Sequence, residues 1–119
     1  MEIKITKSNG KSIAIVTASN IIIGCIQDAV DIIGNCYYQG ADGIILHQHS
    51  IDKRFFDLKT RLAGEVLQKF STYKMRLAIV GDFTEYTSSS LNDFIFESNK
   101  VGQINFVNTI EEAKEKLEK

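Results

Sequence analysis

Proline is absent from this 119-residue chain, although average usage of about 5% would place about six prolines in a chain of this length. Folding therefore includes no slow proline isomerisation step. The chain also lacks Pro-rich and Gly/Ser-rich segments of the kind that link domains. Its length suits one hydrophobic core, so we expect a single domain over residues 1–119.

Cysteine is scarce, with only Cys25 and Cys36. If both lie on one helix, a rise of ~1.5 Å per residue separates them by ~16 Å. A disulfide requires Cα atoms within ~7 Å of each other. We therefore expect two free thiols, as in a reducing compartment, and the spacing is not that of a zinc or redox pair.

Long apolar runs and an excess of one charge are also missing. No run approaches the ~20 residues that span a bilayer, and the start, MEIKITKSNG, is charged and alternating, unlike a signal peptide. The 14 basic and 15 acidic residues are mixed along the chain, and the pI is about 6.1. Nucleic-acid binders usually carry a basic patch, and membrane anchors a basic block. We therefore expect a cytoplasmic protein that binds neither nucleic acid nor membrane.

The strands are marked by their apolar patterns. The segments EIKIT and SIAIVT flank Asn9-Gly10, the strongest short hairpin signal, which predicts two antiparallel strands at the start. Nearly continuous apolar runs at 43–47 and 76–80 are typical of strands buried on both faces of a parallel sheet, and the segment QINFV at 103–107 predicts the last strand.

The helices are marked by helical spacing of apolar residues between these runs. The pattern predicts helices over 25–39, about 57–73 and 88–99, and a fourth helix after Thr109. Glycines at 40 and 102 are placed to end the first and third helices, and Thr109-Ile-Glu-Glu112 matches a capping box. The order β-β-α-β-α-β-α-β-α predicts an α/β fold with right-handed crossovers and an antiparallel hairpin at or near the sheet edge.

Three segments carry a family resemblance: FFDLKTRLAGEVLQKF, LAIVGDFTEYTSSSLNDFIFESN and NCYYQG. They closely resemble the bacterial family known as domain of unknown function 4180, and the resemblance covers essentially the whole chain. That family has no established activity, so the resemblance implies no catalytic residues. Arg61 stands where the family more often has glycine.

The order of elements is more distantly similar to the SpoIIAA-like, or STAS-type, fold. That resemblance implies a mixed β-sheet with the N-terminal antiparallel hairpin, and a role as a regulatory interaction or ligand-sensing module. Such domains carry a regulatory serine or threonine at the start of the helix after the third strand, within an Asp-Ser-Ser/Thr-Gly motif. That motif is absent here, and Asp57 with Thr60 is only an approximate counterpart. Fold alone does not imply mechanism.

A candidate site lies at the rim formed by the carboxyl ends of the central strands, where open α/β sheets bind ligands. The polar residues expected at that rim follow the apolar runs at 43–47 and 76–80 or open the helix between them. They are His47, His49, Ser50, Asp57, Lys59, Thr60, Arg61, Asp82, Thr84 and Glu85.

Two kinds of chemistry are open at this rim. His47 and His49 could bind a metal with Asp82 or Asp57 as a third ligand; no full ligand constellation is visible, and we expect no cofactor. An acid–base enzyme could pair His49 with Asp82 or Glu65, although no nucleophile–base pair or phosphate loop is present. The alternative function is therefore a small hydrolytic or metal-assisted enzyme.

Phosphorylation is a third alternative, at Thr60, Ser50 or the run Ser88-Ser89-Ser90. Phosphate at a helix N-terminus is favoured by the helix dipole and the free amides. The simpler interpretation is capping, because Ser, Thr and Asp are the usual residues at helix starts.

Six aromatic residues gather around the second and third predicted helices: Phe55, Phe56, Phe83, Tyr86, Phe94 and Phe96. Because neighbours in sequence rarely face one core together, we expect Phe55 or Phe56 to be exposed. An exposed aromatic marks a contact surface, and a homodimer with two-fold symmetry is the commonest use of one. The alternative is a hydrophobic staple under the helix start.

The sequence thus predicts a non-catalytic regulatory or small-ligand-sensing module with a protein partner or small ligand. The expected binding residues are Phe55, Phe56, Asp57, Lys59, Thr60, Arg61, His49, Asp82 and Phe83.

Overall fold

The sheet contains five strands in sequence order, in a computed structural model that describes residues 1–119. The strands are β1 (Glu2–Ser8), β2 (Lys11–Thr17), β3 (Gly43–His47), β4 (Arg76–Val80) and β5 (Ile104–Val107). β1 and β2 are antiparallel, and β2 to β5 are parallel. The predicted α/β class, element order and edge position of the hairpin are confirmed.

The β1–β2 hairpin is set by its turn. Asn9 and Gly10 have φ values of 53° and 81°, and a type I′ turn requires positive φ at both central residues. The pairing then runs without a bulge from Ser8↔Lys11 to Glu2↔Thr17.

Four α-helices complete the fold: α1 (Ile26–Tyr38), α2 (Leu62–Thr72), α3 (Ser89–Val101) and α4 (Ile110–Leu117). The residues predicted to end or cap them do so. Gly40 and Gly102 have φ values of 88° and 86° just beyond α1 and α3, and the Thr109 hydroxyl accepts a 3.1 Å hydrogen bond from the Glu112 amide. None of the four helices is long and apolar enough to cross a membrane.

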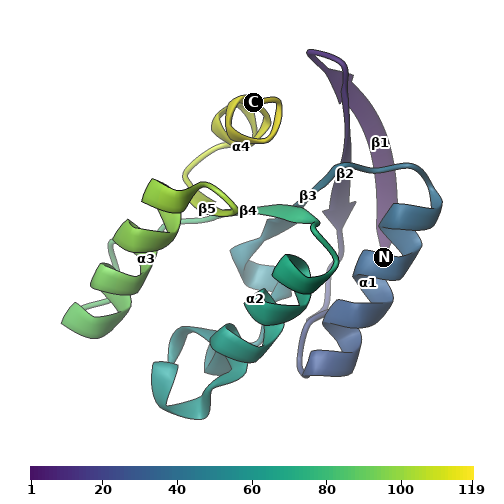
Figure 1. The fold of residues 1–119 in the computed structure, drawn as a ribbon. Coiled ribbons are helices and arrows are strands. Elements are labelled where there is room, and N and C mark those ends of the chain that lie inside the picture. Colours follow the sequence, from purple (N-terminus) through teal and green to yellow (C-terminus); the bar gives the residue numbers. More distant parts are fainter.

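The two faces of the sheet are covered unequally (Figure 1). The main core, 24 buried residues, joins one face to α1, α2 and α3. A second cluster of six residues lies under α4 on the other face and includes Ala113 and Leu117. The carboxyl ends of the parallel strands therefore open between the loops that lead into α2 and α3.

The prediction that the second helix begins near Asp57 is wrong. Residues Lys53–Phe56 and Leu58–Thr60 form two 3-10 turns, and α2 begins only at Leu62. The Asp57 carboxylate does act as a cap, but it accepts from the Lys59 amide within the second 3-10 turn. Arg61, with a left-handed φ of 66°, then breaks the helical path.

Both cysteines are free thiols, as predicted. Cys25 is exposed at the N-cap of α1, whereas Cys36 is buried on the same helix. Burial raises the pKa of the Cys36 thiol to about 11, so this residue behaves as a small apolar core residue.

Candidate functional site

A groove of about 610 Å³ lies at the carboxyl ends of β3 and β4. It is the rim groove from here on, and it occupies the position where open α/β sheets bind ligands. Its lining residues are Ile21, Gln48, His49, Ile51, Asp52, Lys53, Phe56, Val80, Gly81, Glu85 and Tyr86.

One wall of the rim groove is aromatic. The rings of Phe56 and Tyr86 stack with centroids 5.2 Å apart and planes at 17°. Phe55 meets Phe56 edge-on at 4.9 Å, and Phe83 lies 6.1 Å from Phe56 and 5.3 Å from Phe106. Contacts of this kind add about 0.5–1.5 kcal/mol each to the area that they bury, so the wall is a fixed part of the core.

Gln48 ties the two loops of the rim groove together. Its amide nitrogen donates to the Tyr86 hydroxyl at 2.8 Å and to a Glu85 carboxylate oxygen at 3.0 Å. Its amide oxygen accepts from the Asp82 backbone N–H at 2.9 Å. These three hydrogen bonds of the Gln48 side-chain amide hold the β4–α3 loop against the loop after β3.

Gly81 makes this link sterically feasible. A Cβ atom at position 81 would lie 2.5 Å from the Cβ of Gln48, which is closer than non-bonded carbon atoms approach. The Gln48 side chain thus fills the space that a side chain at 81 would take.

Tyr86 keeps a polar group at the groove. Partial burial, with the charge of Glu85, raises the pKa of its phenol, while the hydrogen bond from Gln48 acts in the opposite direction. Because the hydroxyl oxygen accepts from Gln48, its own proton stays available to donate to a ligand.

His47 and His49 stack at the end of β3, with ring centroids 5.4 Å apart. Burial, and then repulsion from His49, lowers the pKa of His47. No group of three or more His, Cys, Asp or Glu side chains could hold a metal ion. The pair predicted as a weak metal site therefore lacks the third ligand that Asp82 or Asp57 was to supply.

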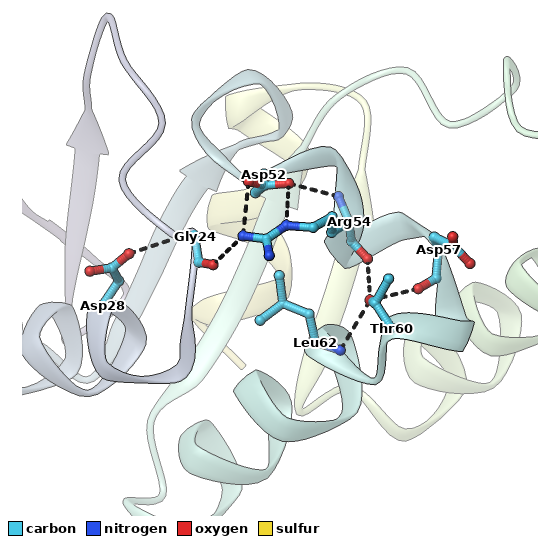
Figure 2. A network of polar contacts seen from close by, with 7 residues as sticks. All are labelled: Gly24, Asp28, Asp52, Arg54, Asp57, Thr60 and Leu62. Carbon is cyan, nitrogen blue, oxygen red and sulfur yellow. Dashed lines mark hydrogen bonds and ion pairs between the residues drawn. The ribbon is translucent and has the colours of Figure 1, made fainter.

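A second polar network lies beside the rim groove, around Arg54 (Figure 2). The guanidinium bridges two segments: it donates to both Asp52 carboxylate oxygens at 3.1 and 3.2 Å, and to the Gly24 carbonyl at 2.7 Å. The Asp28 carboxylate in turn accepts from the Gly24 amide. Hydrogen bonds from Arg54 lower the pKa of Asp52. Arg54 thus fastens the segment before α1 to the first 3-10 turn.

Thr60 belongs to the same network (Figure 2). Its hydroxyl lies 2.6 Å from the Arg54 carbonyl and 2.8 Å from the Asp57 carbonyl, and it accepts from the Leu62 amide at 3.3 Å. The hydroxyl therefore joins the 3-10 turns to the start of α2, which is the capping role that the sequence offered as the simpler interpretation.

The structure brings only some of the predicted residues to the rim groove. His49, Phe56 and Glu85 line it. Asp57 borders a smaller hollow of about 330 Å³ that shares Lys53, Phe56 and Tyr86 with it. The predicted residues that line neither hollow are His47, Ser50, Phe55, Lys59, Thr60, Arg61, Asp82, Phe83 and Thr84.

Two expectations about accessibility need correction. Phe55 and Phe56 are 1% and 6% exposed, so neither is a surface aromatic; the 3-10 turn lets adjacent side chains enter one core. Ser50 is also fully buried, so its hydroxyl is not accessible for phosphorylation in the folded chain. Thr60 is exposed, and its phosphorylation stays a prediction.

Asp82 forms its side-chain hydrogen bonds within its own loop. Its carboxylate accepts from the backbone N–H and the hydroxyl of Thr84, and these hydrogen bonds lower its pKa. Asp82 therefore shapes the loop before α3 rather than facing the rim groove.

Four residues with central roles in this region were not predicted as site residues: Gln48, Asp52, Arg54 and Tyr86. Their roles depend on contacts between segments far apart in the chain, such as Gln48 with Tyr86 and Arg54 with Gly24. The aromatic cluster that included Tyr86 was the one usable signal.

The chain matches the model of a known protein family. The family model described as Domain of unknown function (DUF4180) matches residues 8–117. No curated protein and no solved structure matches the chain significantly.

Proposed function

The chain belongs to the family described as Domain of unknown function (DUF4180), and we propose that it is a non-catalytic module that binds a small ligand in the rim groove. The observation that carries the proposal is the groove itself. Its volume of about 610 Å³ falls within the ~300–1,000 Å³ of known ligand pockets.

The lining supports this proposal. Ligand pockets are mostly apolar, with a few placed polar groups, and the rim groove combines the apolar side chains Ile21, Ile51 and Val80 with the Tyr86 hydroxyl and the Glu85 carboxylate. A suitable ligand has a flat apolar body to lie against these side chains. It also has a hydrogen-bond acceptor for the Tyr86 proton.

We propose binding rather than catalysis because no carboxylate orients the His49 imidazole, the candidate general base, for proton transfer. A general base is normally held by a third group. The carboxylates of Glu85 and Asp82 are engaged by Gln48 and Thr84, and neither bonds to His49.

The test is a metabolite library screened by thermal shift and by ligand-observed NMR. For each ligand found, the affinity is measured for the wild type, for Tyr86→Phe, which removes only the hydroxyl, and for Tyr73→Phe. Tyr73 is an exposed tyrosine at the end of α2, outside the rim groove. We expect roughly five-fold weaker binding for Tyr86→Phe, because one hydrogen bond contributes about 1 kcal/mol, and unchanged binding for Tyr73→Phe. Ligands that bind all three proteins equally, or turnover of a substrate at the groove, would refute the proposal.

We also infer that the fold is SpoIIAA-like, with a regulatory role. The support is the element order and the edge hairpin followed by parallel strands. In such a module Thr60 is an accessible candidate for phosphorylation, as are the exposed residues Ser88, Ser89 and Ser90. A phosphate there would replace the proton that the hydroxyl now donates to the Arg54 and Asp57 carbonyls, and would loosen the start of α2. Intact mass of the protein from its own cells tests the modification; only unmodified protein under all growth conditions would argue against it.

A further inference from the structure

Strand β1 is a regular and uncovered edge of the sheet (Figure 1). It pairs with β2 along all seven residues without a bulge, and the chain has no proline to interrupt its outer side. Soluble proteins usually blunt such edges with bulges, prolines, charges or a covering segment. Here only the charged side chains on the strand remain as a barrier to pairing.

The side chains of this edge strand alternate in character. Ile3 and Ile5 pack against the main core on the face covered by three helices, and Met1, 64% exposed, continues that series. Glu2 and Lys4 are exposed on the opposite face. Ser8 and Lys11 close a two-residue turn, so they form a hydrogen-bonded pair. Because hydrogen-bonded and non-bonded pairs alternate, the free main-chain groups of β1 belong to its odd-numbered residues.

A second copy of the chain can pair with this edge through a two-fold axis perpendicular to the sheet. This symmetry places opposite residues on the same face, so each register is defined by the residue on the axis. With Glu2 or Lys4 on the axis, two like charges meet, which destabilises cross-strand pairs. With Ile5 or Thr6 on the axis, Lys7 lies opposite Ile3 or Ile5.

One register satisfies both faces. With Ile3 on the axis, Glu2 of each copy lies opposite Lys4 of the other, so two ion pairs form on one face. On the other face, Ile3 meets Ile3 and Met1 meets Ile5. Lys4, which would otherwise protect the edge, then has an opposite charge as its partner.

We propose that β1 is a homodimer interface, in which residues 1–5 of two copies pair antiparallel with Ile3 on the two-fold axis. The dimer contains a continuous ten-stranded sheet, because each copy contributes five strands. Each copy keeps its own rim groove, because β1 contributes none of the residues that line it. This inference therefore does not depend on ligand binding.

A charge swap between Glu2 and Lys4 tests both the interface and its register. Sedimentation velocity and native mass spectrometry are used on untagged protein over a range of concentrations. Within the paired residues 1–5, Glu2→Lys leaves two lysines on each copy, and Lys4→Glu leaves two glutamates. We expect each variant alone to self-associate at least about ten-fold more weakly than the wild type, because two symmetry-related pairs change from attraction to repulsion.

The mixture and the double variant complete the test. Mixing Glu2→Lys with Lys4→Glu should give a heterodimer, and Glu2→Lys/Lys4→Glu should restore the homodimer. Lys7→Glu, outside the paired residues, should leave the dimer intact. Far-UV circular dichroism confirms that each variant is folded.

The proposal is overturned if the wild type stays monomeric up to millimolar concentration, or if the single variants dimerise like the wild type. A failure of the mixed variants to form a heterodimer would refute the register.

Discussion

Phe55 and Phe56 show why neighbouring residues need not alternate between core and solvent. A 3-10 turn advances by three residues per turn, so its geometry differs from the strand geometry that separates adjacent side chains. The edge-on contact of Phe55 with Phe56 and the stacking of Phe56 on Tyr86 place both rings in one cluster. These aromatics stabilise the loop that forms the rim groove, and neither phenylalanine ring is exposed on the outer surface.

Replacing either buried phenylalanine should therefore destabilise the protein strongly. We expect Phe55→Ala and Phe56→Ala each to lower the free energy of unfolding by about 3–5 kcal/mol, the usual loss for a buried Phe→Ala change. Phe96→Ala is the matched control, because this side chain on α3 is 63% exposed and its loss should change stability by less than about 0.5 kcal/mol. Urea denaturation of the three variants measures the difference, and equal effects at positions 55 and 96 would contradict it.

A Gly→Ala substitution should have opposite effects on stability at two positions, 81 and 64. Gly81→Ala would force the Gln48 side chain to move and should lower the free energy of unfolding by about 1–3 kcal/mol, as overpacking does. Gly64 lies inside α2, and a Cβ there meets nothing within 4 Å. Gly64→Ala should therefore raise stability by about 0.5–1 kcal/mol, because glycine is unfavourable in a helix.

Denaturant unfolding of both alanine variants tests this pair. Amide exchange should also increase in the β4–α3 loop of Gly81→Ala alone, since the Gln48 bond to the Asp82 amide is lost. A stabilised Gly81→Ala would mean that Gln48 does not hold the loop in the described position.

At the level of elements, the strongest signals were short and local. Asn9-Gly10 marked the hairpin and Thr109 marked the start of α4, because each acts on residues within one turn of itself. The start of α2 was misplaced because it depends on the left-handed Arg61. The spacing of apolar residues along the sequence gives no sign of a single left-handed residue such as Arg61. The rim groove was located only by position, since its polar lining depends on the contact of Gln48 with residues more than 30 positions away.

The left-handed Arg61 at the junction before α2 leads to a prediction. A residue with a side chain pays about 1–2 kcal/mol in this region, whereas glycine does not; glycine is also what the family resemblance suggests for this position. Arg61→Gly should raise the free energy of unfolding by about 0.5–1 kcal/mol, after the extra entropy of glycine in the unfolded chain is subtracted.

The matched control is Lys69→Gly inside α2, where φ is helical and the same change should lower stability by about 1 kcal/mol. Thermal unfolding of both variants distinguishes them. If Arg61→Gly is as destabilising as Lys69→Gly, the 3-10 turn and α2 form one continuous helix in solution.

For the whole molecule, we expect the free energy of unfolding to fall as the pH drops below about 6.5, because His47 becomes protonated. This residue ends β3 opposite Val80, and its pKa is lowered from 6.5 by burial and by His49. The unfolded chain therefore binds a proton at a higher pH than the folded protein. The stability is fully present above pH 6.5 and falls as the pH drops through 6.5 toward the lower folded pKa. The lowered pKa values of Asp52 and Asp82 affect stability only near and below pH 3.8. The pH range of the His47 step is therefore separate from the range in which these carboxylates titrate.

Urea denaturation between pH 5 and pH 8 measures this step in the wild type, His47→Gln and His49→Gln. We expect the step to shrink in His47→Gln, because the titrating group is gone. In His49→Gln it should shrink only in part, since burial, the larger cause of the shift, remains. A profile in His47→Gln that is as steep as in the wild type would assign the pH dependence to other groups, and would show that His47 is hydrated in the folded protein.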